Sequence, residues 1–309
     1  MELSKILGTE FPIIQGGMAN IATGEFAAAV SNAGALGIIG SGGMRAEDLQ
    51  IHIKKCKSLT NKPFGVNIML LNPDANKMAQ IVIDEKIQFV TTGAGNPSEY
   101  MKAWKDAGIK VFPVVSAVVL AKRMEQLGAD AVIMEGTEAG GHIGEATTMA
   151  VLPQVVRAIN IPVIAAGGIA CGEQLLAAHA LGACGVQIGT CLLASEECPI
   201  HDNYKQAILK ADDKDTIVTG RIAGTPVRVL KNNMARKYVA LEKQGADKMD
   251  LEVFTLGSLK KAVFEGNVTE GSLMAGQVAG LVNEIRPLRD ILEGLMNGYY
   301  NRLNEIKGQ

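Results

Sequence analysis

The fold of this 309-residue chain is decided by the stretch Asp130-Ala131-Val132-Ile133-Met134-Glu135 and the loop that follows it, Glu138-Ala139-Gly140-Gly141-His142-Ile143-Gly144. The first part has the length and composition of a buried strand, and the second is a glycine-rich loop carrying one imidazole. Glycine permits positive φ and lets the backbone approach a ligand closely. The pattern predicts a strand that delivers a histidine to a ligand site at its carboxyl end.

The same strand-then-helix unit repeats on both sides of this stretch. We expect strands at residues 12–15, 36–40, 64–68, 89–92, 111–115, 131–135, 163–166 and 186–189. We expect helices at residues 24–32, 46–58, 75–84, 98–106, 117–127, 149–158 and 172–181. Eight such strands predict a (β/α)8 TIM barrel of the α/β class. An open doubly wound sheet is the second choice, because the first βα turn, Gln15-Gly16-Gly17-Met18, lacks a full GxGxxG motif.

The alternation ends near residue 216, and helical patterns follow at residues 259–265, 272–285 and 288–303. We therefore predict a barrel over residues 1–215, a smaller, mainly helical C-terminal cap over 216–285 and a last helix, 286–309, that returns to the barrel. Gly276 and Gly280 stand four apart in the second of these helices, which favours close helix packing.

The cap also carries a modest basic cluster. Its members are Arg221, Arg228, Lys231, Arg236 and Lys237. We interpret the cluster as a solvated face, with a dock for an acidic carrier as the alternative.

Composition narrows the class of protein. The hydrophobic share of 48% fills a core, while a net charge of −2 and 4% aromatics argue against a nucleic-acid partner. No apolar stretch reaches the ~18 residues of a membrane span. No signal peptide is recognisable, so we expect a cytoplasmic protein. The five cysteines form no CxxC pair, so neither a metal site nor a disulfide framework is expected.

A barrel carries its chemistry at the carboxyl ends of its strands, and a phosphate commonly binds after the seventh and eighth. Gly167 and Gly168 follow the seventh expected strand, and Gly189 and Thr190 follow the eighth. Backbone N–H groups there favour a phosphate dianion, and the Thr190 hydroxyl adds a donor. The alternative is that these glycines only close tight turns.

Other polar residues end strands on the same face. His142 follows the sixth strand and is a candidate general acid near neutral pH. Asn67 and Glu135 end the third and sixth strands and suit hydroxyls or ring N–H groups. Gly16 and Gly17 let the backbone lie flat against a planar ring, with Met18 beside it. The other three histidines, His52, His179 and His201, are expected to be structural or exposed.

Cys191 follows the Gly189-Thr190 pair, as a nucleophile would in barrels that oxidise purine nucleotides. The residues after it, Leu192-Leu193-Ala194, are apolar and favour inert packing instead.

Several longer motifs carry a family resemblance over essentially the whole chain. They are residues 12–18 (PIIQGGM), 63–70 (PFGVNIML), 91–98 (TTGAGNPS), 138–144, 161–169 and 274–281. In these motifs the chain resembles the FMN-dependent enoyl-acyl carrier protein reductase II family (FabK), within the nitronate monooxygenase-like superfamily of flavin barrels. The glycine-histidine loop is shared across the superfamily, whereas residues 67–70 and 94–97 look more like the reductase branch.

The resemblance implies FMN as cofactor, NADPH or NADH as reductant and an enoyl thioester on acyl carrier protein as substrate, in the elongation cycle of bacterial-type fatty acid synthesis. It implies an active-site role for His142 and a homodimer. It places these residues along the FMN site: Asn67, Glu135, Gly140, Gly167, Gly168, Gln187, Gly189 and Thr190. Many nitronate monooxygenases carry Gln where this chain has Glu135.

Three rival functions remain open at this point. The first is a nitronate monooxygenase, with the same flavin but oxygen as electron acceptor. The second is a flavin-free barrel for phosphorylated metabolites or purine nucleotides that uses Cys191. The third is a non-catalytic ligand-binding protein, against which the placement of His142 argues.

Overall fold

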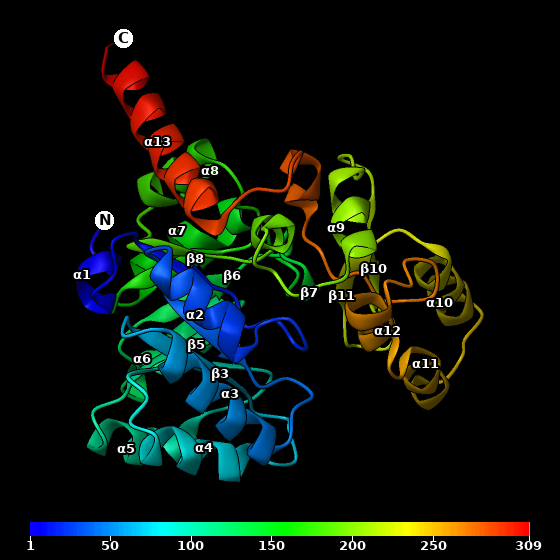
Figure 1. Ribbon diagram of the computed structural model, residues 1–309, viewed down its shortest axis with the longest axis horizontal. Coiled ribbons are helices and arrows are strands. Elements are labelled where there is room, and N and C mark those ends of the chain that lie inside the picture. Colours follow the sequence, from blue (N-terminus) through cyan, green and yellow to red (C-terminus); the bar gives the residue numbers. More distant parts are fainter. Residues whose placement is uncertain (309) are drawn as a thin grey trace.

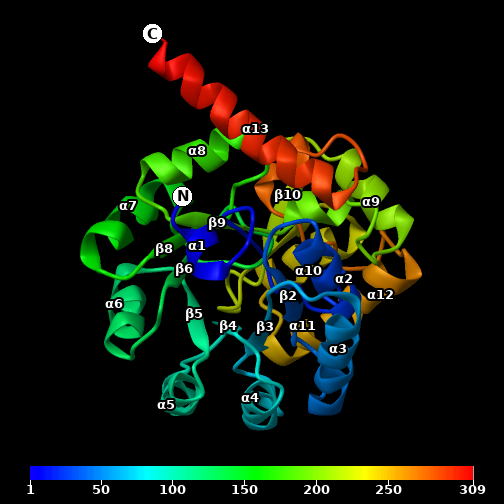
Figure 2. The ribbon, with the colours of Figure 1, turned by 60° about the vertical axis from the view of Figure 1, so that its left-hand side comes forward.

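Eight parallel strands form the centre of the computed structural model, which describes residues 1–308 (Figures 1 and 2). Their order is β1-β9-β8-β6-β5-β4-β3-β2. Ile14 of β1 bridges Leu36 beside β2, so the sheet closes on itself. This closure confirms the predicted barrel and excludes the open sheet. The strands are β1 (Ile13–Gln15), β2 (Gly37–Gly40), β3 (Phe64–Met69), β4 (Phe89–Gly93), β5 (Lys110–Val115), β6 (Val132–Glu135), β8 (Val163–Ala166) and β9 (Gly185–Ile188).

A ring of helices covers the barrel, as Figure 2 shows. It comprises α2 (Gly24–Asn32), α3 (Ala46–Leu59), α4 (Ala75–Asp84), α5 (Ser98–Asp106), α6 (Val118–Gln126), α7 (Thr148–Ala158), α8 (Gly172–Ala180) and α13 (Leu288–Lys307). The last of these, α13, packs against α8 where Gly172 faces Gly298. The hydroxyl of Tyr299 also lies 2.7 Å from Nδ1 of His179. Helix α13 thus packs on the barrel beside α8 and is the eighth helix of the ring.

The barrel interior and the layer between strands and helices are two separate cores. Along β6, Ile133 belongs to the interior core, whereas Val132 and Met134 belong to the outer one. Because successive strand residues point to opposite faces, Glu135 at the end of β6 points inward. The short helix α1 (Leu3–Leu7) adds Leu3 and Leu7 to the interior core and closes the amino end. The carboxyl end is thus left for ligand binding.

The cap is inserted between β9 and α13 and stands to one side of the barrel (Figure 1). After the 3-10 helix η1 (Thr190–Ala194), it contains α9 (Asp202–Leu209), β10 (Thr216–Thr219), β11 (Val227–Leu230), α10 (Asn233–Lys243), α11 (Lys248–Thr255), α12 (Ser258–Glu265) and the 3-10 helix η2 (Gln277–Leu281). The strands β10 and β11 form an antiparallel hairpin. A short strand from the barrel loop, β7 (Gly141–His142), pairs with β11 as the third strand. This small sheet was outside the helical expectation.

The helix expected over residues 272–285 is wrong. Only the 3-10 turn η2 forms there, and the preceding residues are extended. A Cβ at Gly276 would lie 2.6 Å from the carbonyl oxygen of Glu138, and one at Gly280 would lie 3.0 Å from the carbonyl carbon of Asp212. These glycines therefore permit close approach to neighbouring loops rather than helix packing.

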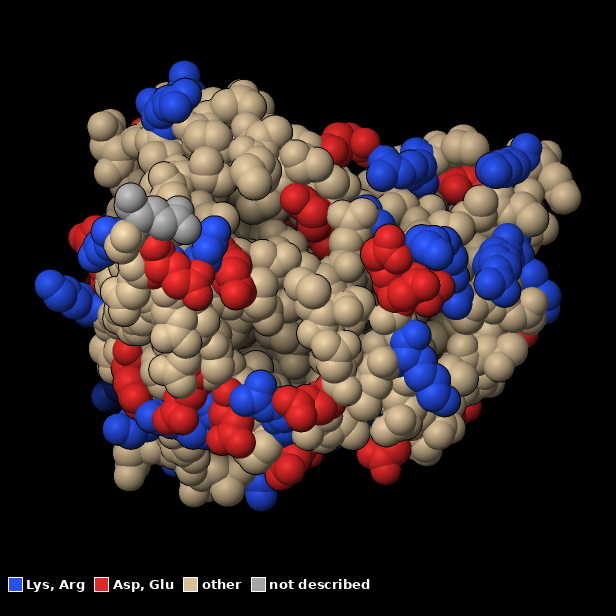
Figure 3. Space-filling view, turned by 90° about the horizontal axis from the view of Figure 1, so that it is seen from above, with Lys and Arg blue, Asp and Glu red and all other residues tan. Residues whose placement is uncertain are grey.

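The expected solvated basic face is confirmed for four of its five members and wrong for one. Arg221, Lys231, Arg236 and Lys237 are exposed, and Figure 3 shows Lys and Arg side chains over the outer surface of the cap. Arg228 is buried, because β11 turns it toward the barrel loop that carries β7.

Two further observations concern the cysteines and the possibility of a membrane-spanning helix. All five cysteines are free thiols. None of the helices within residues 1–308 is long and apolar enough to cross a membrane.

Candidate active site

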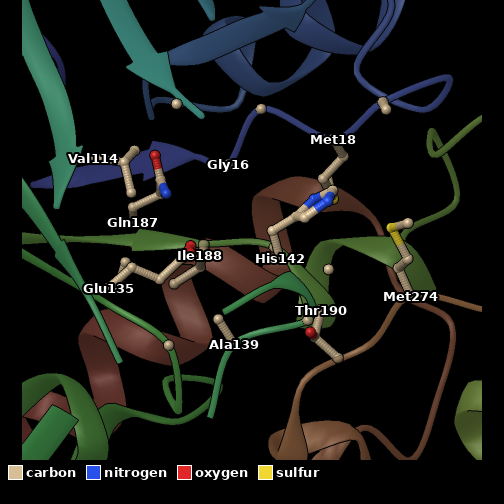
Figure 4. Close-up of a pocket in the computed structure, with 18 of the residues that line it drawn as sticks. Gly16, Met18, Val114, Glu135, Ala139, His142, Gln187, Ile188, Thr190 and Met274 are labelled. Atoms are coloured by element: carbon tan, nitrogen blue, oxygen red, sulfur yellow. The ribbon is translucent and has the colours of Figure 1, made fainter. Parts of the chain in front are cut away.

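A cavity of about 300 Å³ opens at the carboxyl ends of the barrel strands, within the range of ligand pockets. Figure 4 shows side chains from several strands and from the cap converging on it. The structure places all of the sequence-predicted site residues in its lining: Gly16, Gly17, Met18, Asn67, Glu135, Gly140, His142, Gly167, Gly168, Gln187, Gly189 and Thr190. Residues from the ends of five barrel strands, or from the loops that follow them, thus meet at one site.

One end of the cavity is a glycine cradle. Gly167 and Gly168 adopt φ of 88° and 79°, a region that favours glycine. Within residues 1–308, no hydrogen bond uses the backbone N–H groups of Gly167, Gly168 or Gly189. The Thr190 hydroxyl accepts from the N–H of Gly276 (2.9 Å) and keeps its own proton to donate. Unused donors grouped in this way suit an anionic oxygen cluster such as a phosphate.

The cradle is held in place by hydrogen bonds from two residues to which the sequence analysis assigned no role. The carboxylate of Glu138 accepts from the backbone N–H of Thr148 (2.9 Å) at the start of α7. The Thr148 hydroxyl donates to the carbonyl of Gly167 (2.9 Å). The negative charge of Glu138 is therefore stabilised by the N-terminus of helix α7, which favours negative charge. This arrangement leaves the cradle able to accept an anion.

The opposite end of the cavity is lined by amide and carboxyl groups. Asn67 Nδ2 donates to Thr91 Oγ1 (2.9 Å), which leaves the Asn67 carbonyl oxygen for a ligand. Glu135 has no hydrogen-bond partner among the described residues, and burial raises its pKa to about 8. At neutral pH this carboxyl is therefore mostly protonated and offers one donor and one acceptor. A glutamine side chain would likewise offer both a donor and an acceptor at this position.

His142 reaches the cavity from β7. Its backbone is held by pairing with Val227 of β11. In Figure 4 the imidazole lies away from Glu135 and Gln187. The side chain is open to solvent in the cavity, yet the surrounding walls partly desolvate it and lower its pKa below the usual 6.5. The ring is therefore mainly neutral at pH 7 and is still hydrated enough to exchange protons.

The remaining candidates lie elsewhere. His52 accepts from the N–H of Gly24 through Nδ1 (3.1 Å), and His201 caps α9. Together with the His179 contact to α13, these interactions are structural, as expected. Cys191 is buried outside the cavity lining, and burial raises the pKa of its thiol to about 12. Since the thiolate is the nucleophilic form, Cys191 is inert, and the alternative that uses it loses its main support.

Sequence reasoning missed the apolar wall of the cavity. The wall consists of Ile21, Met69, Leu193, Leu259, Met274 and Val278. Three of these belong to the cap. No local signal marks them, because apolar residues in a cap are indistinguishable in sequence from residues of its own core.

The fold and the cavity define a (β/α)8 barrel with an anion-binding cradle beside a histidine at the carboxyl ends of its strands. The family model described as nitronate monooxygenase matches residues 1–298, and this chain belongs to that family. Its members are flavin-dependent oxidoreductases, so the protein is an enzyme of this class.

Individual relatives cover nearly the whole chain. The structure of FabK from Thermotoga maritima has a TM-score of 0.97 and 48% identity, covering 99% of this chain and 98% of that one. This match confirms the resemblance to FabK. The (3aS,4S,5R,7aS)-5-hydroxy-7a-methyl-1-oxo-octahydro-1H-indene-4-carboxyl-CoA dehydrogenase of Rhodococcus jostii is 32% identical, with 98% and 97% coverage. A probable nitronate monooxygenase of Staphylococcus saprophyticus is 32% identical, with 91% and 92% coverage.

Proposed function

We propose that this protein is an FMN-dependent enoyl-acyl carrier protein reductase that uses NADPH or NADH to reduce trans-2-enoyl thioesters in the elongation cycle of fatty acid synthesis. The observation that carries this proposal is the likeness to FabK over the whole chain. The Rhodococcus relative is named for a carboxyl-CoA, which supports a thioester as the substrate class.

The residues present fit FMN. The unused N–H groups of Gly167, Gly168 and Gly189 suit its phosphate. Gly16 and Gly17 present bare backbone to the cavity, where a planar ring could lie against it. Gly17 also packs directly against Asn67, because a Cβ at Gly17 would lie 2.5 Å from the Cβ of Asn67. A flavin ring edge alternates donors and acceptors, and Asn67, Glu135 and Gln187 supply both kinds of partner.

The remaining chemistry falls to the protein's own side chains. When bound, FMN carries the hydride that NAD(P)H provides to the β-carbon of the enoyl thioester. The α-carbon must then gain a proton, and we assign its delivery to His142, as imidazolium or through water. We assign to the same donor the stabilisation of the negative charge that develops on the thioester oxygen. The apolar wall, including Met274 and Leu259, shields the acyl chain from water.

An anaerobic titration tests the proposal. The visible spectrum of purified protein is recorded, one equivalent of NADPH or NADH is added, and then crotonyl thioester on acyl carrier protein or on coenzyme A. We expect the flavin band to bleach and then return, with the carrier-bound thioester effective at lower concentration. His142→Ala serves as the comparison, because it should bleach normally and recover slowly.

Two other results would replace the proposal. The probable nitronate monooxygenases among the relatives favour nitronate oxidation as a second candidate. A band that a nitronate bleaches but NAD(P)H does not would select that function. A protein that shows no flavin band, even after incubation with FMN, would mean that the cradle holds a different phosphorylated ligand.

We further propose that the protein is a cytoplasmic homodimer. Light scattering would measure the mass of the assembly.

A further inference from the structure

A buried arginine that forms no direct ion pair with a carboxylate of residues 1–308 lies behind the active-site loop. Arg228 of β11 is 6% exposed. Its Nε donates to the carbonyl of Thr137 (3.1 Å) and its Nη1 to the hydroxyl of Thr216 (3.0 Å). Both partners are neutral, whereas Arg221 on the same hairpin pairs with Glu145 at the surface. Desolvation lowers the pKa of the Arg228 guanidinium, the nearby Arg221 lowers it further, and the carboxylate of Glu138 in the active-site loop raises it. Burying a cation that forms no direct ion pair is costly, so its presence calls for a compensating role.

The arginine is attached to the loop that carries His142. We call residues 136–146 the histidine loop. Strand β11 pairs with it directly, since Val227 is opposite His142 and Arg228 is opposite Gly141. The N–H of Ile143 donates to the carbonyl of Pro226 (3.2 Å) just beyond this pairing. The histidine loop is therefore the edge strand of the cap's sheet.

The contact with Thr137 fixes the other end of the same loop. Thr137 lies two residues after Glu135, and its N–H donates to the carbonyl of Ala146 (2.8 Å). The Nε of Arg228 donates to the carbonyl oxygen of the same residue, Thr137. Thus one side chain ties the base of the loop to the strand that holds its tip.

The loop requires such a tie because its sequence is permissive. It contains Gly136, Gly140, Gly141 and Gly144, and glycine restrains the backbone least. A charged donor makes a stronger hydrogen bond to a carbonyl than a neutral one, and the planar guanidinium can hold two acceptors in fixed directions.

We infer that Arg228 is a positioning residue for His142: it clamps the base of the histidine loop at Thr137 and so sets where the imidazole delivers its proton. This inference rests on the proposed function. It assigns Arg228 no contact with substrate or cofactor, since Arg228 is absent from the cavity lining. The alternative is that Arg228 only stabilises the cap, through Thr216.

The two roles differ in which half of the reaction they affect. Proton delivery to the enoyl group needs His142, whereas reduction of the flavin by NAD(P)H does not. A displacement of about 1 Å can cost on the order of 100-fold in rate. We therefore expect Arg228→Met to slow the enoyl half-reaction about 10- to 100-fold, to leave NAD(P)H-dependent bleaching within about twofold and to retain FMN.

The experiment uses stopped-flow measurements of both half-reactions on the holoenzyme, with Arg228→Lys as the conservative variant and Arg236→Met as the control. Arg236 is an exposed cap arginine. Arg228→Lys keeps the charge and should recover part of the rate. Arg228→Met in a His142→Ala background should add little further loss, because the clamp acts through the imidazole. Hydrogen exchange of peptides covering residues 137–146 should accelerate in Arg228→Met and stay unchanged in Arg236→Met.

Each other outcome has a distinct meaning. Equal slowing of both half-reactions, loss of FMN, or additive losses with His142→Ala would overturn the positioning role. Unchanged exchange in the histidine loop would overturn it independently of any activity. If Arg228→Met fails to fold, Arg228→Lys decides by the same criteria. A wild-type enzyme that reduces no enoyl thioester would instead refute the proposed function, while the exchange result would still report on the clamp.

Discussion

At the scale of single residues, Glu135 gives the protein a measurable pH dependence. Burial raises its pKa from 4.5 to about 8 in the folded state. The folded protein therefore binds a proton that the unfolded chain releases, and the stability due to this group is full below pH 4.5 and lost as pH rises to about 8. We expect Glu135→Gln without cofactor to be more stable than wild type at pH 8, by on the order of 1–3 kcal/mol. Denaturant unfolding at pH 4.5 and pH 8 measures this difference. A gap of the same size at both values would contradict it.

His142 provides the second prediction at this scale. Since general acid catalysis is worth roughly 100- to 10,000-fold, we expect His142→Ala to retain FMN and to lose enoyl reduction at least ~100-fold. Desolvation lowers the pKa of His142 below 6.5, so the imidazolium is present only in acid. The wild-type rate of the enoyl half-reaction should therefore fall as pH rises through that pKa, and this limb should be missing in His142→Ala. Equal rates and parallel pH profiles would refute the role.

At the scale of an element, the turn after β8 should decide cofactor binding. Gly168 has φ of 79° and lies in the cradle, where a Cβ would be 3.2 Å from Cβ of Glu138. We expect Gly168→Val to be purified without FMN. Gly128 is a matched control, because its φ is 87° but no atom lies within 4 Å of an added Cβ. Gly168→Val and Gly128→Val should strain the backbone to a similar extent, but only Gly168→Val should lose the yellow colour of bound flavin. A fully occupied flavin in Gly168→Val would rule out the cradle as its phosphate site.

At the scale of the whole molecule, the docking of α13 on α8 closes the ring of helices. An added methyl group at Gly172 would overlap the backbone of Gly298 and Tyr299. We expect Gly172→Ala to destabilise the protein by about 1–3 kcal/mol, as overpacking does. Gly294 lies in the same helix α13, with its nearest contact at 3.5 Å, and Gly294→Ala should be neutral or stabilising by up to about 1 kcal/mol. Thermal melts of both variants test this, and equal melting temperatures would show that α13 is not closely docked.

The barrel, and the grouping of its strand-end residues at one cavity, follow from patterns that are local in the sequence. The barrel strands and helices are local patterns of apolar spacing, which depend mainly on neighbouring residues, and several helices, such as α5 and α8, end next to a glycine (Gly108 and Gly182). The parallel barrel then brings the strand ends together. For this reason Asn67, Glu135, Gly167 and Gly189 could be assigned to one pocket from their positions along the chain. The roles assigned to them, and the boundaries of the three parts, remain predictions.

Only the tertiary structure decided how the cap meets the barrel. The hydrogen bond from Arg228 joins the cap to Thr137, which lies 91 residues earlier in the chain. The pairing of β11 with β7 spans a similar separation in sequence. Gly276 and Gly280 resemble a helix-packing motif in sequence, yet they allow loops from other parts of the chain to approach. Such contacts depend on which surfaces the folded barrel presents. A buried arginine and an exposed one therefore look identical in sequence, because burial is set by distant segments and not by neighbours in the chain.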